Sequence, residues 1–401
     1  MLTSLALIFL AGWLLASLCQ RLHLPRLIGM LIAGIVLGPY VLDLFDDSIL
    51  SISADLRKMA LVIILLKAGL SLDLADLRKV GRPALLLSFL PASFEILAVT
   101  LVAPALLGIT YREAALAGAV LGAVSPAVVV PRMVQLIEER YGTQKRIPQM
   151  ILAGASLDDV FVIVLFTTFL QMAQGQAAQL SALGEIPVSI LLGIGLGTLT
   201  GLLLSRFFEH NYSRGQLIRN STKVILVLAI SFLLLAAEDL LAGMVPLSGL
   251  LAIMSMALIL GRKSPAAVTR RLQEKYGKLW LAAELILFVL VGAAVDIRYT
   301  AKAGFAAVLV IGAGLASRTL AVWLCLLGTH LNWQERCFCV IAYLPKATVQ
   351  AAIGAIPLSL GLPCGNLVLS LAVLAILITA PLGAFGMDLS YQRLLEKESC
   401  R

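Results

Sequence analysis

Two adjacent carboxylates, Asp158 and Asp159, stand in the middle of an apolar run, ILAGASLDDVFVIVLFTTF. Neighbouring residues of a helix point about 100° apart, so one carboxylate would face a cavity and the other a neighbouring helix. Two carboxylates close together in a poorly solvated site do not both ionise easily. Such a group holds a proton or a hard cation, but not both. The pair therefore indicates cation–proton exchange, whereas one buried Asp alone would as readily cap a neighbouring helix.

Further charges fall inside apolar runs, where each costs about 2.5–3.5 kcal/mol to insert into a bilayer, and three of them stand out. Glu95 lies in LLLSFLPASFEILAVTLV and Arg318 in GAGLASRTLAVWLCLL. An ion pair between them would neutralise both charges, and we predict a supporting structural pair. Lys346 follows Pro345 in CVIAYLPKATVQAAIGAIPL. It would offset the negative end of a half-helix, and it could also pair with Asp158.

Prolines interrupt two of the apolar runs. GAVLGAVSPAVVVPRMVQL contains Pro126 and Pro131, and the run around Pro345 is broken in the same way. A proline inside a span frees backbone carbonyls, which only protein or a water-filled cavity can satisfy. Paired broken helices in two halves of a chain indicate the binding site of an inverted-repeat transporter. We expect the breaks to cross near Ser125, Pro126, Pro345 and Thr348.

The elements that position these residues are membrane spans. The 401 residues are 60% hydrophobic and 13% charged with a mean hydropathy of +0.98, which excludes a soluble globular chain. The runs are long enough to cross ~30 Å of hydrocarbon. We predict an all-α polytopic membrane protein with thirteen transmembrane helices, near 2–20, 25–42, 56–72, 82–107, 112–135, 147–173, 184–208, 222–241, 245–261, 275–297, 303–328, 334–359 and 365–387.

Counting along these spans divides the chain into two inverted repeats, spans one to six and eight to thirteen, with the seventh as a linker. The broken spans are then each fifth in their repeat, and the spans of Glu95 and Arg318 are each fourth. Pseudo-symmetry would bring Glu95 and Arg318 together. Glycines at 193, 197 and 201 give the spacing that lets helices pack closely.

Loop charges predict the orientation. Most of the 31 Lys and Arg residues lie in the loops of one side, and the other side holds only Arg57, Lys58, Arg112, Arg298 and Lys302. Because basic loops stay inside, the N-terminus is expected outside and the C-terminus in the cytoplasm. The basic residues set topology and do not indicate nucleic acid. The six cysteines form no CxxC pair, so neither a disulfide framework nor a metal site is expected.

The strings GAVSPAVVVPRMVQL, GASLDDV, YLPKATVQAAIG and LLKAGLSLD resemble those of monovalent cation/proton antiporters, in the NHA branch of the sodium/proton antiporters. The resemblance covers nearly the whole chain. It implies a homodimer in the bacterial inner membrane and an elevator movement of a core whose broken helices cross. It also implies Na⁺ or Li⁺ as substrate, no cofactor, Asp159 as the main ion carrier beside Asp158, Glu95–Arg318 as the supporting pair, and Lys346 as the charge at the helix break.

The same resemblance implies the domain boundaries. They are dimerisation helices at 1–80 and 211–298, core helices at 81–175 and 299–388, a linker helix at 176–210 and a cytoplasmic tail at 389–401.

This chain departs from the family in its charged residues, and it has Ala294 where animal members carry an acidic residue. Electrogenic relatives with paired Asp usually carry Lys where this chain has Arg318, and electroneutral relatives keep Glu–Arg but show Asn-Asp. The mixture leaves the stoichiometry open. A K⁺/H⁺ antiporter or an ion-coupled organic-anion symporter of the same fold is the alternative function. An intramembrane protease would need two Asp on different spans or an HExxH helix, which the sequence lacks. A passive channel fits buried titratable carboxylates poorly.

Overall fold

The computed structural model describes residues 1–71, 81–174, 182–213, 219–241 and 247–397, which are almost entirely helical. Four basic residues of the loops and tail expected on the inside, Arg78, Lys79, Arg214 and Arg401, lie outside the described residues. So do the expected domain boundaries near residues 80 and 175, and the last residues of the tail.

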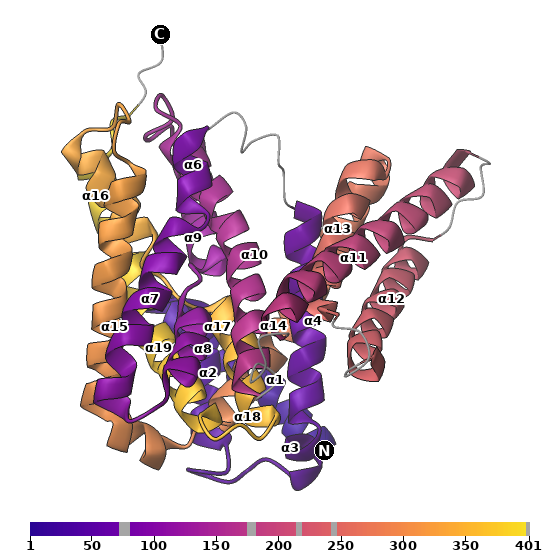
Figure 1. The fold of residues 1–401 in the computed structure, drawn as a ribbon, viewed down its shortest axis with the longest axis horizontal. Coiled ribbons are helices and arrows are strands. Elements are labelled where there is room, and N and C mark those ends of the chain that lie inside the picture. The colour runs from indigo at the N-terminus through magenta and orange to yellow at the C-terminus, as the bar shows by residue number, and fades with distance from the viewer. Residues whose placement is uncertain (72–80, 175–181, 214–218, 242–246, 398–401) are drawn as a thin grey trace. The chain divides into compact units, whose positions relative to one another are not determined.

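The helices follow one another along the chain as Figure 1 labels them. They are α1 (Leu2–Arg21), α2 (Arg26–Leu37), α3 (Asp47–Ser51), α4 (Ser53–Ser71), α6 (Arg82–Leu87), α7 (Leu90–Leu107), α8 (Tyr111–Leu121), α9 (Pro126–Glu138), α10 (Ile147–Ala173), α11 (Ala182–Ser213), α12 (Asn220–Leu241), α13 (Gly249–Lys263), α14 (Ala266–Ala293), α15 (Ile297–Cys325), α16 (Trp333–Ala342), α17 (Thr348–Gly354), α18 (Ile356–Ser359) and α19 (Gly365–Leu394). α19 thus continues into the segment expected as the tail.

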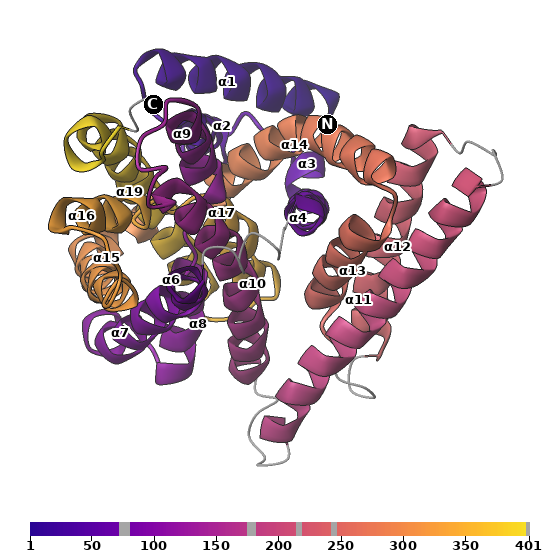
Figure 2. The ribbon, with the colours of Figure 1, turned by 90° about the horizontal axis from the view of Figure 1, so that it is seen from above.

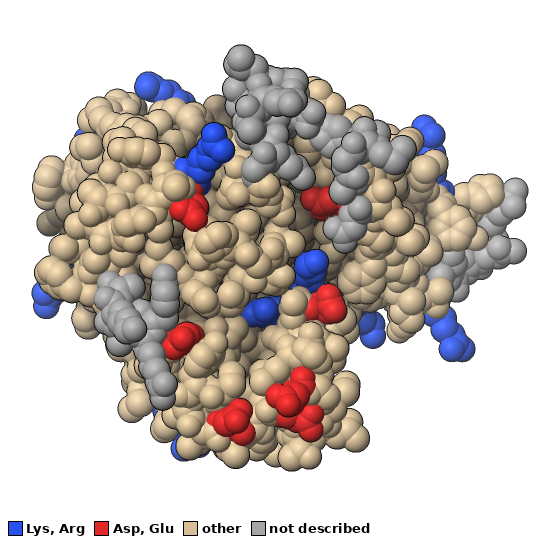
Figure 3. Space-filling model, turned by 60° about the horizontal axis from the view of Figure 1, so that its bottom comes forward, with Lys and Arg blue, Asp and Glu red and all other residues tan. Residues whose placement is uncertain are grey.

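The helices have the length and composition of membrane spans. Within the described residues, nine helical segments are apolar enough and long enough to cross a bilayer. The face drawn in Figure 3 is covered mainly by uncharged residues, with few acidic or basic side chains between them. These findings confirm an all-α polytopic membrane protein. The number of thirteen spans stays a prediction.

The chain divides into two compact units. One contains residues 1–54, 73–173 and 287–401, and the other residues 55–72 and 174–286. Both expected core segments, 81–175 and 299–388, fall almost wholly in the first unit. In the second unit α11 packs along α13. A Cβ at Gly193 would lie 2.7 Å from the carbonyl oxygen of Ser248, so the glycine spacing seen in the sequence does allow a close approach.

The first unit contains two helices that are interrupted midway. α8 starts with a capping box between Thr110 and Glu113, ends at Leu121, and gives way to four non-helical residues before Pro126 opens α9. Proline suits this first helical position because its missing N–H would have no partner there.

The second interruption separates α16 from α17. α16 is capped in the same manner by Asn332 and Glu335 and ends at Ala342. Figure 1 shows α17 beside α8 at the centre of this unit, and Figure 2 shows the same helices from above. α19 packs on both, and a Cβ at Gly383 would overlap the ring of Pro345, so only glycine lets α19 reach the second break.

Candidate functional site

Two packed helices, α7 and α15, each carry one buried charge of the site. Glu95 on α7 is 2% exposed, and Arg318 on α15 is fully buried. The Ser317 hydroxyl donates to the carbonyl of Phe94 over 2.9 Å and so ties the two helices together at this level. Arg318 Nη1 lies 2.7 Å from Glu95 Oε2. The two residues expected to pair are therefore in contact.

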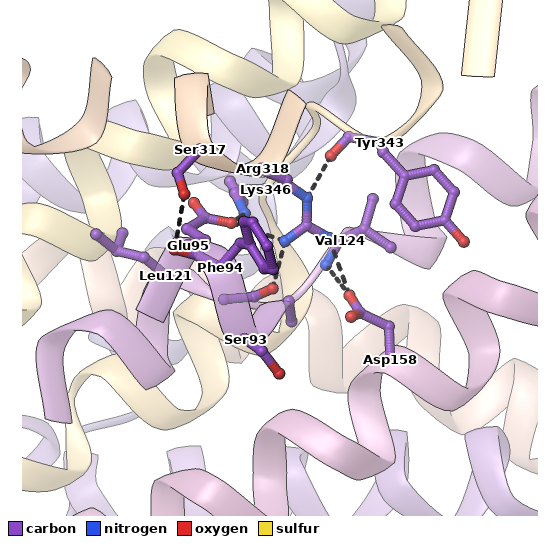
Figure 4. A network of polar contacts seen from close by, with 12 residues as sticks. Ser93, Phe94, Glu95, Leu121, Val124, Asp158, Ser317, Arg318, Tyr343 and Lys346 are labelled. Carbon is purple, nitrogen blue, oxygen red and sulfur yellow. Dashed lines mark hydrogen bonds and ion pairs between the residues drawn. The ribbon is translucent and has the colours of Figure 1, made fainter. Parts of the chain in front are cut away.

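The guanidinium of Arg318 joins both broken helices to the carboxylates (Figure 4). Its Nε donates to the carbonyl of Tyr343 over 2.8 Å, and its Nη1 donates to the carbonyl of Gly122. Its Nη2 lies 3.1 Å from Asp158 Oδ2. Only arginine offers donors in a planar fork that can satisfy several acceptors at once, and these acceptors are the carbonyls that the breaks release.

Asp158 is fully buried on α10 and is engaged by the surrounding structure. Besides Arg318, its Oδ2 accepts a hydrogen bond of 2.7 Å from the backbone N–H of Val124, which lies in the first break. A buried carboxylate is stable only when it is paired and hydrogen-bonded, and both conditions hold here. Asp158 therefore fastens α10 to the break.

Asp159, the next residue on α10, differs from Asp158 in its surroundings. It is 7% exposed, and its Oδ1 is buried without a hydrogen-bond partner in the described part of the chain. No basic side chain of the described residues forms an ion pair with it. This contrast follows from the angle between neighbouring helical residues, which turns Asp159 away from Arg318.

Lys346 lies at the second break and is 1% exposed. Its Nζ forms an ion pair with Glu95 Oε2, and its backbone N–H donates to Thr379 Oγ1 over 2.9 Å. Glu95 thus balances a second cation. The alternative partner considered from the sequence, Asp158, is instead held by Arg318 and the backbone of the first break.

The two breaks meet through their backbones. Ser125 N–H donates to the carbonyl of Pro345 over 2.8 Å. Pro126 and Thr348 open the half-helices that follow the breaks, α9 and α17. The hydroxyl oxygens of Ser125 and Thr348 are buried and have no hydrogen-bond partner among the described residues. The four residues expected at the crossing are thus brought together.

Sequence reasoning missed one member of this crossing, Gln350. Its amide bonds to backbone groups of both breaks. Two features of YLPKATVQAAIG could have indicated it. The glutamine is an amide in an otherwise apolar half-helix, and it stands at the third position of α17, where a side chain can reach back to the helix start.

The charges of the site do not cancel. Glu95, Asp158 and Asp159 contribute three carboxylates, and Arg318 and Lys346 contribute two cations. One negative charge remains when all five groups are ionised. A single proton or a single monovalent cation would neutralise it.

An all-helical membrane fold with two broken helices crossing beside buried, partly balanced charges defines a cation/proton antiporter. The chain belongs to the family of sodium/hydrogen exchangers, whose transmembrane model matches residues 5–387. The class predicted from the sequence is therefore confirmed, and Na⁺ and H⁺ are the ions that this family exchanges.

Relatives and solved structures agree with this membership. Sodium/hydrogen exchanger 9B2 of Homo sapiens is 34% identical over 389 residues, which are 93% of this chain and 70% of that protein. The protein of the same name from Xenopus tropicalis is 34% identical over 99% of this chain and 75% of its own length. The sodium proton antiporter MjNhaP1 from Methanocaldococcus jannaschii superposes with a TM-score of 0.84 at 21% identity, covering 98% of both chains. At this identity the likeness shows that the two proteins share a fold.

Proposed function

We propose that this chain exchanges Na⁺ or Li⁺ for H⁺, and that the cation and the proton compete for Asp159 beside Asp158. One observation carries the proposal. Of the three buried carboxylates of the site, Asp159 is the one without a cationic partner among the described residues. Glu95 pairs with both Arg318 and Lys346, and Asp158 pairs with Arg318, so these two carboxylates are engaged by the fixed cations.

The unbalanced charge supports coupling of the two ions. An uncompensated charge in the middle of a bilayer costs about 2.5–3.5 kcal/mol or more. The site with neither ion bound would carry that cost when it moves across the membrane, and the site with one ion bound would not. Movement restricted to the loaded forms produces exchange instead of leakage.

Buried oxygen atoms without hydrogen-bond partners, at the crossing and on α10, suit a hard monovalent cation. Asp158 Oδ1, Ser125 Oγ and Thr348 Oγ1 are buried at the crossing or on α10 and accept or donate no hydrogen bond in the described chain. Hard cations prefer carboxylate, hydroxyl and carbonyl oxygens. We assign these oxygens, with Asp159, as the ligands of the transported cation.

The proposal includes the movement and the assembly that the family resemblance implies. A core of α6–α10 and α15–α19 would move as an elevator, and α1–α4 with α12–α14 would form the homodimer interface, with α11 as linker. The contacts between the two breaks support a core that moves as one body, because Arg318 and the Ser125–Pro345 bond join both repeats directly.

The protein is a multi-pass membrane protein. We assign it to a bacterial inner membrane with the N-terminus outside and the C-terminus in the cytoplasm. The asymmetric distribution of Lys and Arg between the loops supports this orientation.

The test uses purified protein in liposomes with an internal pH-sensitive dye, to which NaCl, LiCl or KCl is added outside. Wild type should move protons in response to Na⁺ and Li⁺, and Asp159→Asn should reduce the rate to that of empty liposomes. Asp388→Asn is the matched control, since Asp388 is an exposed carboxylate paired with Arg132 on α9. It should exchange like wild type.

Other outcomes would replace the proposal. Exchange with KCl alone would identify a K⁺/H⁺ antiporter, and uptake that requires an organic anion would identify a symporter of the same fold. Wild-type rates in Asp159→Asn would mean that the carrier group lies elsewhere.

A further inference from the structure

The amide of Gln350 lies between the two broken helices. Gln350 is fully buried on α17. Its Oε1 accepts a hydrogen bond of 2.8 Å from the N–H of Ala347, in the second break. Its Nε2 donates to the carbonyl of Ala123, in the first break, over 2.8 Å, and more weakly to Leu121 over 3.4 Å. One side chain therefore satisfies freed backbone groups of both breaks.

The two backbone groups that Gln350 holds are next to the free hydroxyls of the crossing. Ala123 precedes Ser125 by two residues, and Ala347 precedes Thr348 by one. Both hydroxyl oxygens are buried without a hydrogen-bond partner in the described chain. The separation of Ser125 from Thr348 thus depends on the length of the amide bridge between their backbones.

The chemistry of the bridge requires an amide. It needs an acceptor for an N–H and a donor for a carbonyl at the end of a side chain of fixed length. Glutamate could accept but not donate, and methionine could do neither while filling a similar volume. Arg318 also joins both breaks, but it does so through one carbonyl of each and leaves the Ala347 N–H to Gln350.

We propose that Gln350 is a positioning residue that fixes the separation of the two breaks and thereby the cation selectivity of the site. This inference rests on the proposed function, because it takes the oxygens of Ser125 and Thr348 as cation ligands. Selectivity between monovalent cations depends on the spacing and number of the coordinating oxygens. Groups that hold ligands in place affect ion affinity although they do not touch the ion.

The test compares Gln350→Met with Ile353→Val, a packing change on the same buried half-helix at an aliphatic side chain that forms no hydrogen bond. Initial exchange rates with Na⁺, Li⁺ and K⁺ are measured over a range of concentrations in proteoliposomes. Gln350→Met should lower the ratio of Na⁺ to K⁺ exchange about tenfold. Ile353→Val should keep the wild-type ratio. A residue that served only to fill space would leave the ratio unchanged in both variants.

Two further measurements keep the inference separable from the proposed function. Asp159→Asn is assayed in the same preparation. If it abolishes exchange while Gln350→Met keeps the wild-type ratio, the site stands and the role of Gln350 is refuted. If Asp159→Asn exchanges at the wild-type rate, the proposed function is refuted, whatever ratio Gln350→Met gives. Should the Met variant not yield folded protein, Gln350→Asn keeps the amide on a side chain one methylene shorter. Its Na⁺/K⁺ ratio should also fall, and a wild-type ratio would overturn the inference.

Discussion

Arg318 Nη2 lies 3.1 Å from Asp158 Oδ2, whereas the neighbouring Asp159 forms no ion pair within the described residues. The two carboxylates that the sequence presents as one motif therefore differ in their partners. Asp158 joins α10 to the fixed charges of the site, and we propose that Asp159 binds the transported ion.

Neutralising Asp158 should destabilise the protein, whereas neutralising Asp159 should not. Asp158→Asn leaves Arg318 with one buried carboxylate fewer, and breaking a buried pair costs about 3–5 kcal/mol. Asp159→Asn removes a buried charge that has no cationic partner among the described residues, and it should leave the Tm unchanged or raise it. Thermal unfolding in detergent, followed by intrinsic fluorescence, checks this. Equal losses of Tm in the two variants would contradict the difference in pairing.

Glu95 and Lys346 should be energetically coupled. Glu95→Gln leaves the Lys346 ammonium buried without a carboxylate, and Lys346→Gln removes a charge from Glu95. The double variant removes both partners and returns the net charge of the site to one negative charge, as in wild type. We expect it to unfold at a higher temperature than Glu95→Gln, and the double-mutant cycle should give a favourable coupling energy of about 0.5–3 kcal/mol. Additive effects would show that the pair contributes nothing.

Replacing Arg318 should change the charge that accompanies exchange. In wild type we expect Asp159 to be the carboxylate that exchanges its proton for the cation, since Arg318 holds Asp158, so one cation replaces one proton and a membrane voltage should not alter the rate. In Arg318→Lys the single ammonium cannot satisfy both breaks and both carboxylates, which releases Asp158 to take up a second proton. A K⁺ diffusion potential imposed on proteoliposomes should then shift exchange in the variant alone. A voltage-dependent wild type would refute this stoichiometry.

Gly154 on α10 should be important for exchange, because it packs against Tyr343 and Tyr343 binds Arg318. A Cβ at Gly154 would overlap the hydroxyl of Tyr343, whose carbonyl accepts the bond from Arg318 Nε. Gly154→Ala must move either Tyr343 or α10, and overpacking of this kind costs about 1–3 kcal/mol. We expect slower exchange and a lower Tm. Gly312→Ala on α15 is the control, since a Cβ there meets no atom within 4 Å, and it should behave as wild type.

Much of the site could be predicted from the sequence because charge and proline are costly in an apolar span. Asp158, Asp159, Glu95 and Arg318 were conspicuous for that reason, and counting spans was enough to bring Glu95 to Arg318. The positions of the breaks followed from Pro126 and Pro345.

The remaining features depend on packing that no local pattern records. The sequence could not show which Asp meets Arg318, since that depends on the rotation of α10 about its axis. It could not show that Lys346 reaches Glu95, because the two residues lie on spans that are not equivalent in the two repeats, the fourth and the fifth. Gln350 was overlooked because a neutral amide in an apolar run carries no charge to explain, although it bonds to both breaks.

The competition at Asp159 can be measured without transport. Purified protein in a weakly buffered solution is titrated with NaCl near the pH of half-maximal exchange, and the released protons are recorded. Wild type and Asp388→Asn should release about one proton for each cation bound, because a carboxylate cannot hold both ions. Asp159→Asn should release none. Proton release of wild-type size from Asp159→Asn would contradict the central role of that residue.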